Sequence, residues 1–62
     1  MRYIFKPDEE VLVNAQHGDH WMLTGMTGKV LEGPLCGDDV YWVKLDTGLK
    51  IKIHGRDLRE NR

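Results

Sequence analysis

The chain has a single cysteine, Cys36, and its apolar runs extend over only a few residues. One cysteine excludes a disulfide within the chain and is typical of a reducing compartment. The opening residues, MRYIFKPDEE, lack the apolar segment of a secretion signal, and no stretch approaches the roughly 20 apolar residues of a transmembrane helix. We therefore expect a cytoplasmic protein that has no membrane partner.

The chain also lacks a large excess of charge of either sign. Lysine and arginine number 9 and aspartate and glutamate 10, so that the formal net charge is −1. This balance provides no overall attraction to nucleic acid or to an anionic membrane, and charge-driven binding would require a local patch. With 62 residues the chain is expected to form one domain, over residues 1–62, because a chain of this length buries only about 60% of its extended surface.

The clearest pattern lies in residues 40–54, VYWVKLDTGLKIKIH, where apolar and polar side chains alternate with the period of a β-strand. A three-residue loop with Gly48 in the left-handed conformation pairs Leu45 with Leu49 and brings the apolar residues of both arms to one face. A two-residue loop would mix the faces, and the pattern therefore predicts one register. This register pairs Val43 with Ile51 and Tyr41 with Ile53.

The rest of the chain predicts shorter elements. We expect strands at 11–13, at 27–32 and at 58–60, with a 3₁₀ turn over 55–58 before the last one. Gly28 is expected to mark a bulge or a close approach of two backbones. Residues 3–5 are expected to form an edge piece that closes the barrel. In the long segment 15–25, Trp21, Met22 or Leu23 should cover an open end of the core, since a small core needs its large apolar side chains.

This order of elements resembles that of the small SH3-like barrels. The segments GMTGKVLEG and VYWVKLDTG look most like the KOW-type barrel of ribosomal and transcription-elongation proteins, and the resemblance covers residues 8–60. It implies an all-β, partly open barrel of five strands with a long first loop and a 3₁₀ turn before the last strand. Such a barrel is too narrow to hold a ligand inside, so binding would take place on the loops or on the outer face of the sheet.

The layout is also similar to that of the plasmid- and integron-borne type II dihydrofolate reductases. Their catalytic strand reads Val-Gln-Ile-Tyr, and the corresponding residues here are Ile-Lys-Ile-His at 51–54. Lys52 replaces the glutamine and His54 the tyrosine, and the family's basic residue on the first strand falls near the apolar Val13. We therefore expect the shape of this family without its activity, and no cofactor.

The outer face of the predicted hairpin is the best candidate for a binding site. The register places Trp42 opposite Lys52, Lys44 opposite Lys50 and Val40 opposite His54. Because like charges directly opposite each other are destabilising, such a face is suited to something anionic and flat. Two alternatives remain open: a cation–π contact within the chain between Lys52 and Trp42, and lysines that merely prevent edge-to-edge aggregation. Acidic residues weaken the patch, namely Asp38, Asp39 and Asp46.

The loop histidines and the single cysteine are candidates for metal binding. His17 and His20, three residues apart with Asp19 between them, could bind Zn²⁺ with Cys36. They lie in a loop, however, and the chain has no second cluster of cysteine or histidine that would complete four-fold coordination. Solvated loop histidines and a bystander thiol are the simpler interpretation, and no metal site is expected.

No arrangement of nucleophile, base and oxyanion site is evident, nor a phosphate-binding glycine loop, and we expect no enzymatic activity. The first hypothesis is a protein–protein interaction module that self-associates through the outer hairpin face and the Trp21-bearing loop. It is based on the apolar residues expected to face outward, which are Leu12, Leu31, Val40 and Trp42. The alternative is a KOW-like module that contacts nucleic acid through Trp42, Lys44, Lys50, Lys52 and His54.

Overall fold

The computed structural model describes residues 4–16, 18, 20–35 and 37–61. It contains five strands and two single 3₁₀ turns, in the order β1 (Glu10–Val13), η1 (Trp21–Leu23), β2 (Thr27–Glu32), β3 (Val40–Leu45), β4 (Lys50–His54), η2 (Gly55–Asp57) and β5 (Leu58–Glu60). Within the described residues, no helix is long and apolar enough to cross a bilayer.

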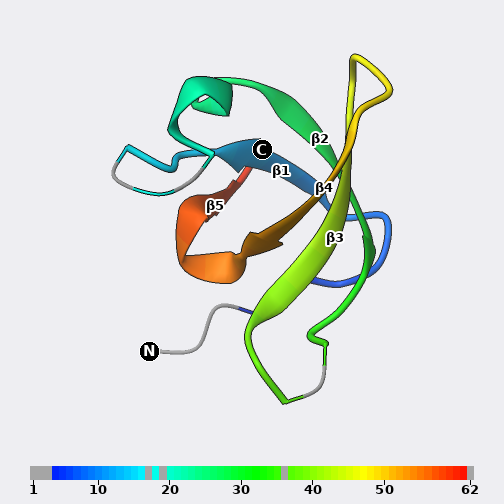
Figure 1. Ribbon diagram of the computed structural model, residues 1–62. Coiled ribbons are helices and arrows are strands. Elements are labelled where there is room, and N and C mark those ends of the chain that lie inside the picture. Colours follow the sequence, from blue (N-terminus) through cyan, green and yellow to red (C-terminus); the bar gives the residue numbers. More distant parts are fainter. Residues whose placement is uncertain (1–3, 17, 19, 36, 62) are drawn as a thin grey trace.

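All strands belong to one antiparallel sheet with the order β4-β3-β2-β1-β5. The sheet curls around the core, and its two edge strands are not paired with each other among the described residues, so that it forms a partly open barrel (Figure 1). The expected all-β, five-stranded fold is confirmed, as are the 3₁₀ turn and the positions of all five strands.

The hairpin of β3 and β4 has the predicted register. Tyr41 lies opposite Ile53 and Val43 opposite Ile51. The Leu45 N–H donates to the Leu49 carbonyl over 2.8 Å, and Gly48 has a φ of 94°. Leu49 itself was expected on the buried face, and this expectation was wrong, since Leu49 is 51% exposed. It precedes β4 at the end of the hairpin that projects beyond the core (Figure 1).

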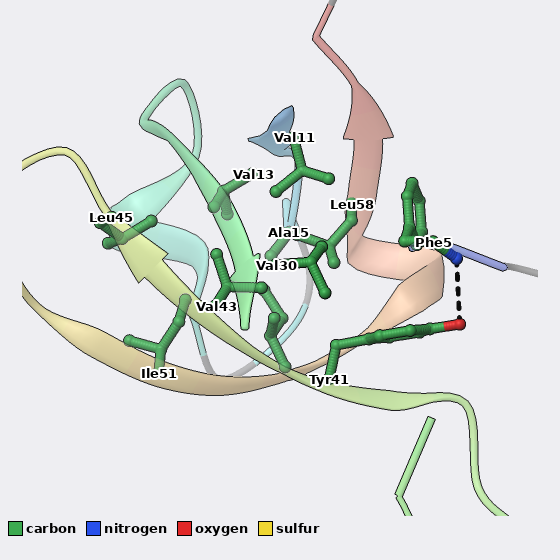
Figure 2. Packing of buried hydrophobic residues seen from close by; sticks show 11 residues of the cluster. Phe5, Val11, Val13, Ala15, Val30, Tyr41, Val43, Leu45, Ile51 and Leu58 are labelled. Carbon is green, nitrogen blue, oxygen red and sulfur yellow. Dashed lines mark hydrogen bonds between the residues drawn. The ribbon is translucent and has the colours of Figure 1, made fainter. Parts of the chain in front are cut away.

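The core consists of side chains from all five strands and from the segments that flank β1 (Figure 2). Phe5 belongs to it: its ring packs edge-on against Tyr41 with the centroids 5.5 Å apart, and its N–H donates to the Tyr41 hydroxyl over 3.2 Å. Residues 3–5 were expected to form an edge piece; the described residues 4 and 5 form no strand, and Phe5 is held by its contacts with Tyr41. Tyr3 lies outside the described residues. The buried residues are Phe5, Val11, Val13, Ala15, Val30, Tyr41, Val43, Leu45, Ile51, Ile53 and Leu58.

Gly28 is the site of a close backbone approach, one of the two predicted alternatives. A Cβ atom at this position would lie 2.5 Å from the Lys44 carbonyl oxygen and 2.8 Å from the Leu45 Cα. The backbone of β3, which is paired with β2 here, therefore excludes a side chain at position 28. The irregularity in the pairing of these strands comes later, between Val30 and Glu32.

The long loop between β1 and β2 covers the core with Leu23, which was one of the three residues expected to do so. Leu23 and the following Met26 are partly buried against the core, whereas Trp21 is 61% and Met22 69% exposed. A lid formed by Trp21 or Met22 was therefore a wrong expectation. In a 3₁₀ turn of three residues, successive side chains point in three different directions, so that the residues of η1 cannot all face the core.

Candidate functional site

Three lysines lie side by side in a row across three neighbouring strands. Lys44 of β3 is opposite Lys50 of β4 on one side and opposite Lys29 of β2 on the other. All three side chains are exposed, while their neighbours on the same strands alternate into the core. We call these residues the lysine row.

Lys29 was not among the predicted binding residues. Its alternation with Gly28 and Val30 placed it on the outer face of a strand, but nothing in the sequence set the register between β2 and β3. This register depends on the close approach at Gly28, which the tertiary structure determines.

The lysine row concentrates positive charge in a chain that is nearly neutral. With neighbouring strands about 4.8 Å apart, the row extends over about 10 Å. Like charges directly opposite each other cost a few tenths of a kcal/mol up to about 1 kcal/mol per pair. Among the described residues, no hydrogen bond or salt bridge engages the three ammonium groups. The acidic residue Glu10 lies opposite Lys29 at the end of the row.

Trp42 adjoins the row. It occupies the next outward position of β3 after Lys44, opposite Lys52 on β4 and opposite Glu32 on β2, and its side chain is half-buried. The alternative of a cation–π contact with Lys52 does not occur among the described residues. The indole is thus held by the sheet, and no cation of the described residues stacks on it.

Trp42 also lines an open groove of about 330 Å³ together with Leu31, Glu32 and Lys50. The groove lies at the irregularity of β2, where the register shifts between Val30 and Glu32. Such a bulge places two residues of one strand opposite one residue of its partner. Leu31, which is 41% exposed, and Glu32 therefore both lie beside Trp42. No sequence pattern indicates this bulge, because no glycine lies between Val30 and Glu32.

Lys52 and His54 have the predicted positions on the outer face but serve different purposes. The Lys52 side chain is exposed, and its backbone carbonyl lies 2.9 Å from His20 Nε2. His54 is half-buried, and its Nδ1 accepts a hydrogen bond of 3.0 Å from the Arg56 N–H, which caps η2. Because this nitrogen already serves as a structural acceptor, His54 is a poor candidate for ligand binding.

The loop histidines were expected to be solvated. His20 instead is half-buried and contacts β4 through the Lys52 carbonyl, so that this expectation was wrong for His20. His17, Asp19 and Cys36 lie outside the described residues, and the candidate metal site is therefore not placed. Within the described part of the chain, no group of three or more histidine, cysteine, aspartate or glutamate residues could hold a metal ion.

Of the acidic residues expected to weaken the patch, Asp46 lines a small pocket together with Lys29 and Glu10. The Asp46 carboxylate accepts a hydrogen bond from the Thr27 hydroxyl at the end of the hairpin. Asp38 and Asp39 lie in the connector before β3, whereas Lys44 lies near the opposite end of that strand. None of them lines the groove beside Trp42.

Trp21 is not part of this surface. It lies on η1 between β1 and β2, next to His20, which contacts the Lys52 carbonyl of β4, and it does not line the groove. The predicted binding residues thus divide into two surfaces. One comprises the lysine row with Trp42, and the other is the exposed turn of Trp21 and Met22.

The chain matches no protein-family model, no curated protein and no solved structure. The resemblances to the KOW-type barrels and to the type II reductases therefore stay predictions.

Proposed function

We propose that this protein is a non-enzymatic binding module for single-stranded nucleic acid, with the lysine row contacting phosphates and Trp42 providing a surface for a base. The observation that carries the proposal is the addition of Lys29 to Lys44 and Lys50. Three adjacent lysines, none of which forms a salt bridge among the described residues, provide the kind of local patch that a nearly neutral chain needs in order to attract a polyanion.

The same row argues against self-association through this face. A twofold interface brings a surface against a second copy of itself. Where the twofold axis passes through the row, lysines of one copy meet lysines of the other, and such like-charge contacts oppose binding. Of the apolar residues expected outward, Leu12 and Val40 are only half-exposed, which leaves less apolar surface than the first hypothesis assumed.

A single strand suits the surface better than a duplex. Trp42 lies on the face of a sheet and its side chain is half-buried, whereas the bases of a double helix are stacked inside it. The unstacked bases of a single strand can turn toward an aromatic ring, while lysines follow the backbone, and this combination is common to proteins that bind single strands without sequence preference.

The proposal is tested by measuring the affinity for a dye-labelled thymidine oligonucleotide by fluorescence anisotropy over a range of salt concentrations. Three phosphate contacts on a single strand give a slope of log K against log[salt] of about −2. Lys44→Gln should weaken binding and reduce the slope by about 0.7, because it removes the central contact. Lys6→Gln is the matched control: Lys6 is exposed and outside the row, and its loss should leave the slope unchanged. Absence of binding at low salt, or equal losses in both variants, would contradict the proposal.

A second candidate function is protein–protein contact or self-association through the η1 turn. It is favoured by the exposure of two adjacent large apolar side chains, Trp21 at 61% and Met22 at 69%. A patch this small buries too little area for a tight complex. We expect a dimer with a dissociation constant of roughly tens of micromolar, which sedimentation equilibrium would detect.

The variant Trp21→Ser should abolish this association. Leu49→Ser is its control, since Leu49 is similarly exposed, at 51%, but lies on the hairpin loop away from η1. A wild-type chain that sediments as a monomer throughout this range would eliminate the second candidate.

A further inference from the structure

The groove beside the lysine row combines three chemical features. Trp42 supplies a flat apolar surface, Leu31 a second apolar contact, and Glu32 a carboxylate, with Lys50 at the border to the row. Its volume of about 330 Å³ is at the lower end of the range of small-ligand sites, about 300–1,000 Å³. A ligand that matches these features is flat, presents hydrogen-bond donors at one edge and carries a negative charge nearby.

The distances on the sheet suit a nucleotide. Trp42 and Lys44 are two residues apart on β3, which corresponds to about 7 Å along an extended strand. A base stacked on Trp42 therefore leaves its own phosphate, or the next one, beside the lysine row. Glu32 lies across from Trp42, at the side of the groove toward β2.

The carboxylate of Glu32 distinguishes between bases. An ionised carboxylate only accepts hydrogen bonds, and it can accept two at once. Guanine has two adjacent donors on its Watson–Crick edge, N1–H and the N2 amino group. Adenine and cytosine place a ring-nitrogen acceptor next to their amino donor, and thymine flanks its single N–H with two carbonyl oxygens, so that each of them brings an acceptor toward the carboxylate. We infer that the groove preferentially binds guanine, an inference that rests on the proposed function.

The test compares dye-labelled thymidine oligonucleotides whose central position is thymidine, adenosine or guanosine, again by fluorescence anisotropy. The wild-type protein should bind the guanosine oligonucleotide roughly fivefold more tightly than the other two, since an exposed bidentate contact gives the low end of base discrimination. Glu32→Gln should bring this ratio close to one. It should not weaken binding of the all-thymidine oligonucleotide, because it removes a negative charge.

Glu10→Gln provides the matched control. Glu10 is an exposed carboxylate opposite Lys29, at the end of the lysine row, and it does not line the groove. Its loss removes the same charge and should raise the affinity for all three oligonucleotides equally, with the guanosine preference retained.

The possible outcomes distinguish the guanine preference from nucleic-acid binding itself. Equal affinity of the wild type for all three oligonucleotides would overturn the guanine inference and leave the proposed function intact. Equal preference for adenosine and guanosine would mean that purine stacking decides, and would overturn the inference in the same way. A guanosine preference that survives Glu32→Gln would overturn the role of Glu32. Failure to bind any of the oligonucleotides would overturn the proposed function together with the inference.

Discussion

The two faces of the β3–β4 hairpin come from the same short segment, but they differ in the kind of side chains that lie opposite each other. On the inner face, Tyr41, Val43 and Ile53 are buried and pair with apolar residues of the facing strand. On the outer face, Lys44 and Lys50 lie directly opposite each other although their charges repel. The comparison indicates that the inner face was shaped by stability and that the outer face carries an energetic cost, which a binding role would account for.

The two faces should differ most in how much their side chains contribute to the free energy of unfolding, and two adjacent residues of β4 allow this comparison. Ile53→Ala removes a core side chain that is 2% exposed and should lower the free energy of unfolding by about 2–5 kcal/mol, through lost burial and the cavity left behind. Lys52→Ala changes the exposed neighbour and should stay within about 0.5 kcal/mol of the wild type. Urea denaturation monitored by circular dichroism measures both. If both variants lost the same free energy of unfolding, the two faces would not differ in their contribution to stability.

A smaller effect of opposite sign is expected at the centre of the lysine row. Lys44→Glu replaces two like-charge pairs, with Lys29 and with Lys50, by two attractive ones. It should raise the free energy of unfolding by a few tenths of a kcal/mol up to about 1 kcal/mol at low salt, while binding of the thymidine oligonucleotide is lost.

Lys44→Gln is the control for this gain, because it removes the repulsion without adding attraction and should stabilise the chain less. The gain should shrink as salt is added, since these side chains are exposed and screened. A Lys44→Glu variant that is less stable than the wild type at low salt would show that the row is not a source of repulsion. The outer face would then carry no energetic cost.

Local patterns predicted most of the secondary structure. The alternation in residues 40–54 and the glycine at 48 determined the hairpin, its loop and its register, because a shift by one residue would have turned every side chain to the wrong face. The same reasoning placed β1, β2, η2 and β5. It failed at the end of the hairpin, where Leu49 follows the alternation but lies beyond the core, and in η1, where a single turn does not constrain which side chains are buried.

The candidate site was predictable only in part. Trp42, Lys44 and Lys50 follow from a hairpin whose strands are joined by a short loop, so their juxtaposition is a local property of the sequence. Lys29 and Glu32 join them from β2, across the longer connector between β2 and β3, and no alternation pattern contains that register. The sequence by itself thus determined two faces and two of the three lysines. Only the tertiary structure decided that the third lysine completes the row and that a carboxylate lies beside the indole, because the pairing of β2 with β3 depends on the packing at Gly28 and on the bulge between Val30 and Glu32.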